Sequence, residues 1–209
     1  LFFPVGLSSD FTNEIMPIAA NLIAGKGFTV DGVTPWAWKG PLYPLITAFF
    51  VLFAGENVLV QRMFMLLLDF LCVPLVIKLG RLALSERVGL VAAWIWAFYV
   101  PSIWLSAILN YEAVATVLLL AALAGLLSRG FRNPAWAIGS GLILSLATLC
   151  KASALLLGPF LFLPVLLNIR TRRSVRRGLF LFAFFSLLGI IPWTIRNYHR
   201  FGTFVPVAA

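Results

Sequence analysis

The chain has 209 residues, of which 62% are hydrophobic and 11% are charged, and its formal net charge is +9. Soluble domains carry about 25% charged residues, so this chain lacks the polar surface that an ordinary soluble domain needs. Its 14% aromatic residues also argue against a disordered chain. The composition predicts a membrane protein. Because the sequence opens at Leu1 without a methionine, we expect a piece of a longer polypeptide.

The first part of the chain does not resemble a series of long spans. Residues 1–7 are apolar and are expected to be the outer end of a truncated first span. Residues 8–40 are more polar and contain several glycines and prolines. Residues 41–55 are apolar but too short to cross a bilayer, so we expect an interfacial or re-entrant helix there. The range 8–56 is therefore predicted to be the first outer loop.

Long apolar stretches make up the rest of the chain. A spanning helix needs about 20 apolar residues, and continuous rather than alternating runs indicate helices instead of barrel strands. The predicted spans are 57–79, 88–111, 113–128, 133–150, 152–169 and 178–195. The expected fold is all-α: a polytopic transmembrane helical bundle of about six full spans, at 57–195, plus the truncated first one. The whole range 1–209 is expected to be a single module.

The basic residues predict how the chain is oriented in the membrane. If the end of 57–79 is cytoplasmic, most of the 16 Lys and Arg residues lie in inside loops. A cluster of arginines fixes this assignment best; it consists of Arg170, Arg172, Arg173, Arg176 and Arg177. Because this cluster is a short loop between two spans, we expect no nucleic-acid partner. Most carboxylates then lie outside, so any chemistry is expected to face outward from the cell (inner) membrane.

Four acidic residues are candidates for chemistry. Asp10 and Glu14 are four apart, so on a helix they would share one face and could both point into an outer cavity. Asp10 equally suits a helix N-cap, and Glu112, at an outer helix end, could also be a cap. Asp69 lies within a span, where it must face protein or water. A structural hydrogen bond, a protonated acid and a catalytic or pathway role all stay open for Asp69.

Three cations stand next to predicted outer boundaries, against the usual inside bias. They are Lys39, Lys151 and Arg196, from segments far apart in the sequence. An anionic ligand at the interface would compensate for them, and a lipid phosphate suits helix ends and cations together. The alternative is that each side chain reaches to the headgroups.

Cysteine and histidine usage points away from a built-in metal centre. Cys72 and Cys150 lie inside apolar stretches and are expected to be buried packing residues. His199 is the single histidine and supports neither a metal site nor a Ser–His pair. We therefore assign no metal ligand and no certain cofactor, while a divalent metal stays possible.

Three motifs resemble a known superfamily. The first is the segment from Glu14 to Phe28, and the second is Lys-Gly-Pro-Leu-Tyr-Pro at 39–44. The third is Pro-Trp-Thr-Ile-Arg-Asn-Tyr at 192–198, followed by Phe201-Gly202. Together they are similar to bacterial polyprenyl-phosphate-dependent glycosyltransferases of the GT-C superfamily, which includes protein O-mannosyltransferases and the lipid A aminoarabinose transferase.

The resemblance implies an inverting sugar transfer on the outer face from an isoprenoid-phosphate sugar to an acceptor glycan, lipid or protein. It implies a general base in the first outer loop, for which Asp10 is the first choice and Glu14 the rival. It places Lys39, Lys151 and Arg196 on the donor phosphate. It also makes Glu112 a second outer acid.

Two other classes of protein stay open from the sequence. A transporter or flippase of lipid-linked saccharides also needs cations beside a lipid phosphate, but it needs no base in the outer loop. A non-catalytic membrane assembly subunit is the other alternative.

Overall fold

The computed structural model describes residues 6–157 and 173–208 of the chain. Within these ranges the protein is helical, without a β-strand; Thr29 and Pro35 form an isolated bridge. The all-α prediction is therefore confirmed. The predicted truncated span at 1–7 and most of the predicted span at 152–169 lie outside the described residues, as do Arg170 and Arg172.

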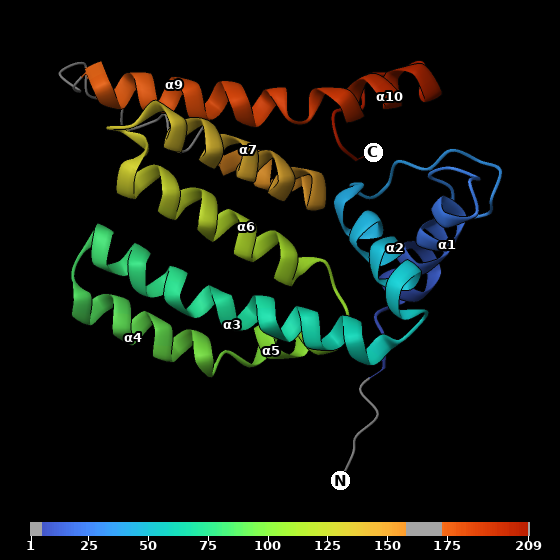
Figure 1. Cartoon of the computed structure of the whole chain (residues 1–209), viewed down its shortest axis with the longest axis horizontal. Helices are drawn as coiled ribbons and strands as arrows, with labels where there is room; N and C mark the ends of the chain where they lie inside the picture. The colour runs from blue at the N-terminus through green and yellow to red at the C-terminus, as the bar shows by residue number, and fades with distance from the viewer. Residues whose placement is uncertain (1–5, 158–172, 209) are drawn as a thin grey trace, which may run out of the picture.

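The long helices lie side by side in one layer (Figure 1). Its elements in spatial order are α4 (Glu86–Ala97) with α5 (Val100–Ala107), then α3 (Val58–Ala83), α6 (Glu112–Gly125) with the π-helical turn η2 (Leu126–Gly130), α7 (Pro134–Cys150), and α9 (Arg173–Leu188) with α10 (Ile191–Phe201). Helices that follow one another in the chain from α3 to α7, with α4 and α5 taken together, run antiparallel, whereas the spatial neighbours α3 and α6 run parallel, as do α7 and α9 (Figure 1). Helix ends therefore meet at both edges of the layer.

Two helices stand at one end of this layer (Figure 1). A π-helical turn, η1 (Phe11–Ile15), leads into α1 (Met16–Ile23), and α1 packs against α2 (Leu42–Ala54). The predicted helix at 41–55 thus exists as α2, and the region 8–56 carries helices as expected. Short α2 lies beside α1 and not among the long helices.

Among the residues that the structure describes, three helices are long and apolar enough to cross a membrane: Val58–Ala83, Glu112–Gly130 and Val175–Phe201. These match the predicted spans at 57–79, 113–128 and 178–195, although the last continues beyond residue 195. The predicted span at 88–111 is a pair of helices, α4 and α5, bent by 50°. A break occurs there because Pro101 has no N–H to donate to the carbonyl of Ala97, the last residue of α4, and its ring would clash with that carbonyl in a continuous helix.

The remaining predicted spans are shorter where the structure describes them. The segment at 133–150 forms α7, which is apolar but has 17 residues. The segment at 152–169 begins with a 3₁₀ turn, η3 (Ala152–Leu156). The expected total of six full spans is therefore not confirmed by the described residues.

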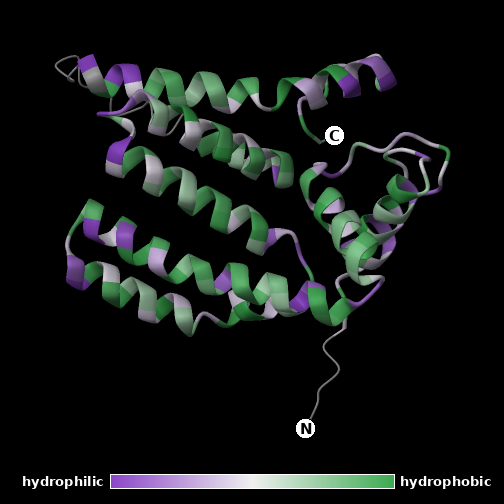
Figure 2. Ribbon diagram, viewed as in Figure 1, coloured by the Kyte–Doolittle hydropathy of each residue, from purple (hydrophilic) through white to green (hydrophobic). Residues whose placement is uncertain are grey.

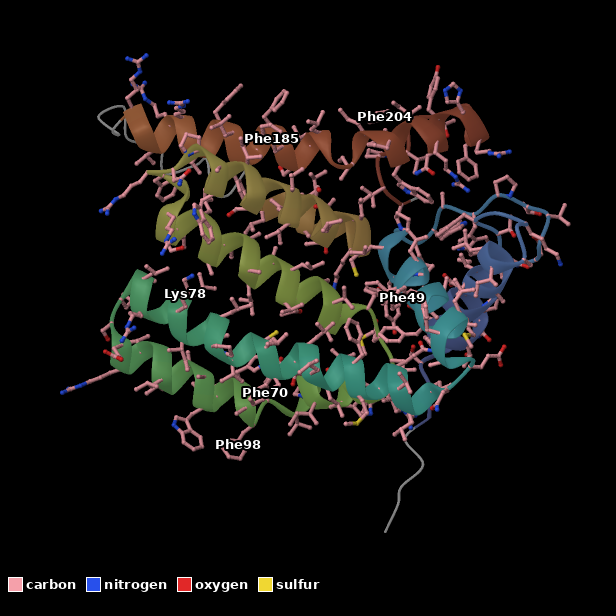
Figure 3. The ribbon with its side chains drawn as sticks, in the orientation of Figure 1. Phe49, Phe70, Lys78, Phe98, Phe185 and Phe204 are labelled. Atoms are coloured by element: carbon pink, nitrogen blue, oxygen red, sulfur yellow. The ribbon has the colours of Figure 1, made fainter. Side chains whose placement is uncertain are left out.

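Polar side chains gather at the two ends of the layer, and apolar ones fill the middle (Figure 2). Outward-facing aromatic rings include Phe70 on α3 and Phe98 at the end of α4, which are 69% and 72% exposed (Figure 3). Exposed apolar rings on long helices suit contact with lipid rather than water. Cys72 and Cys150 are both free and buried, which confirms their predicted packing role.

Close helix contacts are made possible by glycine. A Cβ atom on Gly80 of α3 would lie 2.4 Å from the Cα of Gly89 on α4, and one on Gly141 of α7 would lie 2.4 Å from the carbonyl oxygen of Phe182 on α9. Small residues let neighbouring backbones approach in membranes, where packing replaces the hydrophobic effect as the driving force. These contacts fix the layer that carries the site.

Candidate active site

Glu112 and Lys151 are brought together by two antiparallel helices. Glu112 opens α6, and Lys151 directly follows the last residue of α7. An acid at a helix N-terminus and a base at a helix C-terminus each complement the local helix dipole. The Lys151 Nζ atom donates to both carboxylate oxygens of Glu112, at 2.7 and 2.8 Å. Glu112 therefore forms an ion pair; its side chain does not cap α6.

Asp10 and Lys39 form a second ion pair beside the first. The Lys39 Nζ atom donates to Oδ2 of Asp10 at 2.7 Å. The Asp10 side chain makes no capping hydrogen bond. Ser8 supplies the cap, since its Oγ atom accepts from the backbone N–H of Phe11. The capping alternative for Asp10 is therefore wrong, and its carboxylate is directed at a lysine.

Glu14 lies close enough to act on the same lysine. Burial alone would lower the pKa of Lys39, but its hydrogen bond to Asp10 and the negative charges of Asp10 and Glu14 outweigh burial and raise it. One carboxylate oxygen of Glu14, Oε2, is buried and has no hydrogen-bond partner among the described residues. Asp10 therefore pairs with Lys39 directly, and Glu14 adds a second negative charge nearby.

The ring of Tyr111 joins the two ion pairs. Lys39 Nζ lies 5.5 Å and Lys151 Nζ lies 6.0 Å from the centre of this ring. A cation within about 6 Å of an aromatic face is attracted to it. Sequence reasoning assigned no role to Tyr111, although its position directly before Glu112 was a usable signal. In the structure it is the common surface on which both lysines rest.

A buried core beneath the site fixes these positions. Tyr43 of α2 packs edge-on against Tyr111, at 6.4 Å between ring centres, and Phe11 lies 6.5 Å from Tyr43. Tyr43 and Phe11 are each 1% exposed. This aromatic stack connects η1, α2 and α6 and thereby holds both ion pairs in one place.

The loop before Glu112 is strained. Leu109 is fully buried and has a φ of 57°, a left-handed conformation that costs a bulky residue about 1–3 kcal/mol. Ser8 secures the loop, since its backbone N–H donates to the carbonyl of Ile108 at 2.9 Å and its Oγ donates to the carbonyl of Leu109 at 3.3 Å. The start of the described chain therefore fixes the segment that presents Tyr111 and Glu112.

Gly40 explains why Lys39 reaches this site. A Cβ atom on Gly40 would lie 2.1 Å from the carbonyl oxygen of Leu149, near the end of α7. Only a residue without a side chain lets the outer loop pass so close to that helix end. Lys39 is thereby placed next to Lys151. Sequence reasoning named Lys39 but gave Gly40 no role, although its place between Lys39 and Pro41 was a signal.

Arg196 has a different set of partners. Its guanidinium donates to the carbonyl oxygens of Trp36 and Phe28, at 3.0 and 3.3 Å. It also lies over the rings of Trp193 and Phe28, at 4.6 and 5.5 Å. These contacts fasten the outer loop to α10. The predicted phosphate contact of Arg196 stays a prediction, because the structure does not place it at the two lysines.

The motif around Arg196 also holds the C-terminal segment. Fully buried Asn197 donates through Nδ2 to the carbonyls of Val205 and Val207, and Trp193 donates through Nε1 to that of Val207. Gly202 ends α10 in a left-handed conformation, with φ at 66°. The Pro-Trp-x-x-Arg-Asn-Tyr motif therefore builds a fold-back of the chain.

An apolar groove adjoins the Glu112–Lys151 pair. Its volume is about 330 Å³, and both charged residues lie at its edge. The rest of its lining is mainly small and aliphatic; it comprises Ala115, Thr116, Leu119, Ser153, Ala154, Leu156 and Leu157. A groove of this composition suits a hydrocarbon chain whose charged end meets Lys151. Across the described residues, no three His, Cys, Asp or Glu side chains gather as a metal site requires.

Comparisons with known proteins identify the family of the chain. A search of curated proteins and a search of solved structures each found no match. A family model described as dolichyl-phosphate-mannose-protein mannosyltransferase matches residues 38–195. The matched range includes Lys39, Glu112 and Lys151, whereas Asp10 and Glu14 precede it. Because the match covers most of the sequence, the chain belongs to the dolichyl-phosphate-mannose-protein mannosyltransferase family, membrane glycosyltransferases of the GT-C type.

Proposed function

We propose that this protein transfers a sugar from a polyprenyl-phosphate donor to an acceptor with inversion at the anomeric carbon. The observation that carries the proposal is the pair of lysines, Lys39 and Lys151, on one tyrosine ring beside an apolar groove. A lipid phosphate has the same two parts: an anion that two ammonium groups can hold and a hydrocarbon tail that needs an apolar surface.

The donor is placed by its two chemical parts. The isoprenoid chain lies in the apolar groove, and its phosphate lies at Lys151 and Lys39. Both ammonium groups are already oriented by carboxylates, Glu112 and Asp10, so little reorganisation is needed when charge develops. Glu112 then acts as a positioning residue for Lys151.

The reaction is a single displacement. An acceptor hydroxyl oxygen attacks the anomeric carbon, and its proton passes to a carboxylate, Asp10 or Glu14. The bond between the anomeric carbon and the phosphate oxygen breaks, and its electron pair leaves with the lipid phosphate. Lys39 and Lys151 stabilise the negative charge that grows on this leaving group. The free, buried Oε2 atom of Glu14 makes it a full rival to Asp10 as the base.

The site is proposed to face outward from the cell (inner) membrane. Lys78, at the far end of α3, marks the opposite edge of the layer (Figure 3). Arg81 lies in the last turn of α3, and Arg132 and Arg177 line one pocket between the end of η2 and the start of α9. The end of α3 and the start of α9 lie at that same edge (Figure 1). An excess of Lys and Arg is typical of the cytoplasmic side. The edge with Asp10 and Glu112 is then the outer one.

Sugar transfer by matched variants tests the proposal. We expect Asp10→Asn or Glu14→Gln to lower the transfer of labelled sugar from a polyprenyl-phosphate-sugar donor by about 10²–10⁴-fold, the usual contribution of a general base. The double variant should be no more active than the worse single one. Asp31→Asn is the control, because Asp31 is an exposed turn residue of the same loop.

The same experiment separates an enzyme from a transporter or flippase of lipid-linked saccharides. A transporter needs the lysines but has no use for a base. If both acid variants and the double variant keep full transfer activity, the catalytic role is wrong. If they keep donor translocation while no variant and no wild-type protein transfers sugar, the transporter is the correct alternative.

A further inference from the structure

A polar cavity adjoins the candidate active site on the other side of α6. Its volume is about 130 Å³, and it lies among α3, α5 and the first turn of α6. The polar members of its lining are Asp69, Trp96, Ser102, Ser106, Glu112 and Thr116. Roughly 10–15 Å³ of such volume is enough to hold one water, so the cavity has room for several waters or for one hydroxyl-bearing ring.

Asp69 lies where a carboxylate has a high free-energy cost. It lies near the middle of the spanning helix α3, where a carboxylate costs about 2.5–3.5 kcal/mol even on insertion scales. Ser102 of α5 donates its hydroxyl proton to Oδ1 of Asp69. A carboxylate has about four acceptor positions, so one hydroxyl leaves most of them available to the cavity. The sequence left its role open, and the structure directs it at a cavity.

Two hydrogen-bonding atoms of the cavity lining lack partners. The Oγ atom of Ser106 and the Nε1 atom of Trp96 are buried, and neither has a hydrogen-bond partner among the described residues. Ser106 is 1% exposed. A buried polar group without a partner costs about 1–3 kcal/mol. The cavity therefore presents donors and acceptors together, which is the pattern of a site that takes a polar molecule.

The mixture of groups selects the chemical class of that molecule. Carboxylate oxygens accept from hydroxyl groups, while the Trp96 N–H and the Ser106 hydroxyl donate to hydroxyl oxygens. Trp96 and Tyr99 add aromatic surface for the C–H faces of a ring. A negatively charged ring would be repelled by Asp69 and Glu112. These properties together fit a neutral, hydroxyl-rich ring, which is a sugar.

We infer that this cavity binds the sugar ring of the lipid-linked donor. The inference rests on the proposed function, whose phosphate site it adjoins. Glu112 and Thr116 line both the apolar groove and the polar cavity, so the first turn of α6 separates the two. A donor whose phosphate lies at Lys151 then has its tail on one side of this turn and its sugar on the other. Asp69 and Ser106 become determinants of sugar binding.

Binding of lipids with and without a sugar tests the inference. Purified protein in nanodiscs is titrated with polyprenyl-phosphate-mannose, with polyprenyl-phosphate-glucose and with polyprenyl phosphate that carries no sugar. We expect the wild type to bind at least one sugar-bearing lipid more tightly than the bare lipid. Asp69→Asn should weaken binding of that lipid by about tenfold while binding of the bare lipid changes less than about twofold.

Ser106→Ala gives a second, independent variant. It removes a buried hydroxyl that has no partner, so its thermal stability should equal or exceed that of the wild type. Its affinity for the sugar-bearing lipid should nevertheless fall. A merely structural serine would show no such loss. Asp31→Asn serves again as the control, because Asp31 lies in the exposed outer loop.

Each outcome is decisive. Bare polyprenyl phosphate that binds the wild type as tightly as every sugar-bearing lipid overturns the cavity assignment and leaves the phosphate site intact. Asp69→Asn and Ser106→Ala variants that bind all lipids like the wild type also overturn it. If the wild type binds neither class of lipid, the proposed function fails together with the inference.

Discussion

Gly40 and Leu149 touch where the outer loop meets the end of α7. A Cβ atom on Gly40 would lie 2.1 Å from the carbonyl oxygen of Leu149, closer than any carbon and oxygen can approach without movement. This contact sets the distance between the loop that carries Lys39 and the helix end that carries Lys151. The two cations of the candidate site thus owe their proximity to a residue that has no side chain.

Gly40→Ala should therefore damage both stability and lipid binding. Because the obstacle is backbone, relief requires the loop to move, and such overpacking costs about 1–3 kcal/mol. We expect a lower midpoint of thermal unfolding and weaker binding of polyprenyl phosphate. Gly139→Ala is the matched control: nothing lies within 4 Å of its added Cβ, and alanine suits the interior of α7. Equal behaviour of the two variants would contradict the role of Gly40.

Lys39→Met and Lys151→Met should each weaken binding of bare polyprenyl phosphate by about tenfold, since each removes one charge-assisted contact of roughly 1.5–3 kcal/mol. Methionine keeps an unbranched, flexible side chain over the Tyr111 ring. Isothermal titration in nanodiscs gives the affinities. Lys26→Met is the control, because Lys26 belongs to an exposed turn of the outer loop. Unchanged affinity in both lysine variants would remove them from the phosphate site.

Binding of bare lipid and sugar-bearing lipid should show no titration of Lys39 in the neutral range. The pKa of Lys39 is raised above its ordinary 10.5, because the hydrogen bond to Asp10 and nearby negative charges outweigh burial. A raised lysine pKa means that the ion pair is fully formed below the ordinary value and is lost as pH rises through the folded-state value. Affinity for polyprenyl-phosphate-mannose should stay level from about pH 6 to 9. A drop within that range that Lys39→Met abolishes would contradict the assignment.

Asp31 gives a pH dependence of opposite sign in the same loop. Hydrogen bonds from the Thr34 hydroxyl and from the backbone N–H groups of Val33 and Thr34 lower the pKa of Asp31 to about 2. The turn is therefore stabilised above the ordinary pKa of 3.8, and this stabilisation is lost as pH falls through about 2. Amide exchange at Val33 and Thr34, corrected for intrinsic rates, should stay slow at about pH 4. Asp31→Asn should speed it at neutral pH.

Arg196→Gln should loosen the outer loop. The change removes hydrogen bonds to the carbonyls of Trp36 and Phe28 and the contact with the Trp193 ring. Hydrogen exchange at the Trp36 amide should become faster by about tenfold or more, since bonds from a charged donor contribute about 1.5–3 kcal/mol. Arg200→Gln, on the exposed face of α10, is the control. If Arg196 instead binds the donor phosphate, lipid affinity will fall without faster exchange at Trp36.

Hydrophobic composition and the spacing of charged residues were sufficient to predict the long helices α3 and α6. The apolar run at 57–79, which carries Arg62, Asp69 and Lys78, and the charge-free run at 113–128 predicted α3 and α6 closely, because a bilayer span requires a continuous apolar stretch. The run at 88–111 was predicted to be one span, but the structure has two helices there, because the absence of charged residues does not reveal the break before Pro101. Hydropathy reports the free energy of placing side chains in the membrane. It does not report where a helix axis changes direction.

The candidate site was predictable in part. Acids and lysines at predicted outer boundaries named Asp10, Glu14, Lys39, Glu112 and Lys151, and the structure brings these five residues together. Arg196 looked equivalent because it is also a cation at a boundary. Its actual partners are two backbone carbonyls, which every residue possesses and which no sequence pattern reveals. Tyr111 and Gly40 were missed for a related reason, since their roles depend on where a neighbouring chain passes.

The left-handed backbone at Leu109 has a consequence for how the reactive surface is maintained. A strained loop relaxes unless other contacts hold it in place. Here those contacts are the hydrogen bonds from Ser8, which lies before the family-matched range of 38–195. Trimming the polypeptide to the matched region would remove Ser8 along with Asp10 and Glu14. Tyr111 would then lose its fixed orientation, and the two ammonium groups would lose the ring that they share, even though α3, α4, α6, α7 and α9 remained.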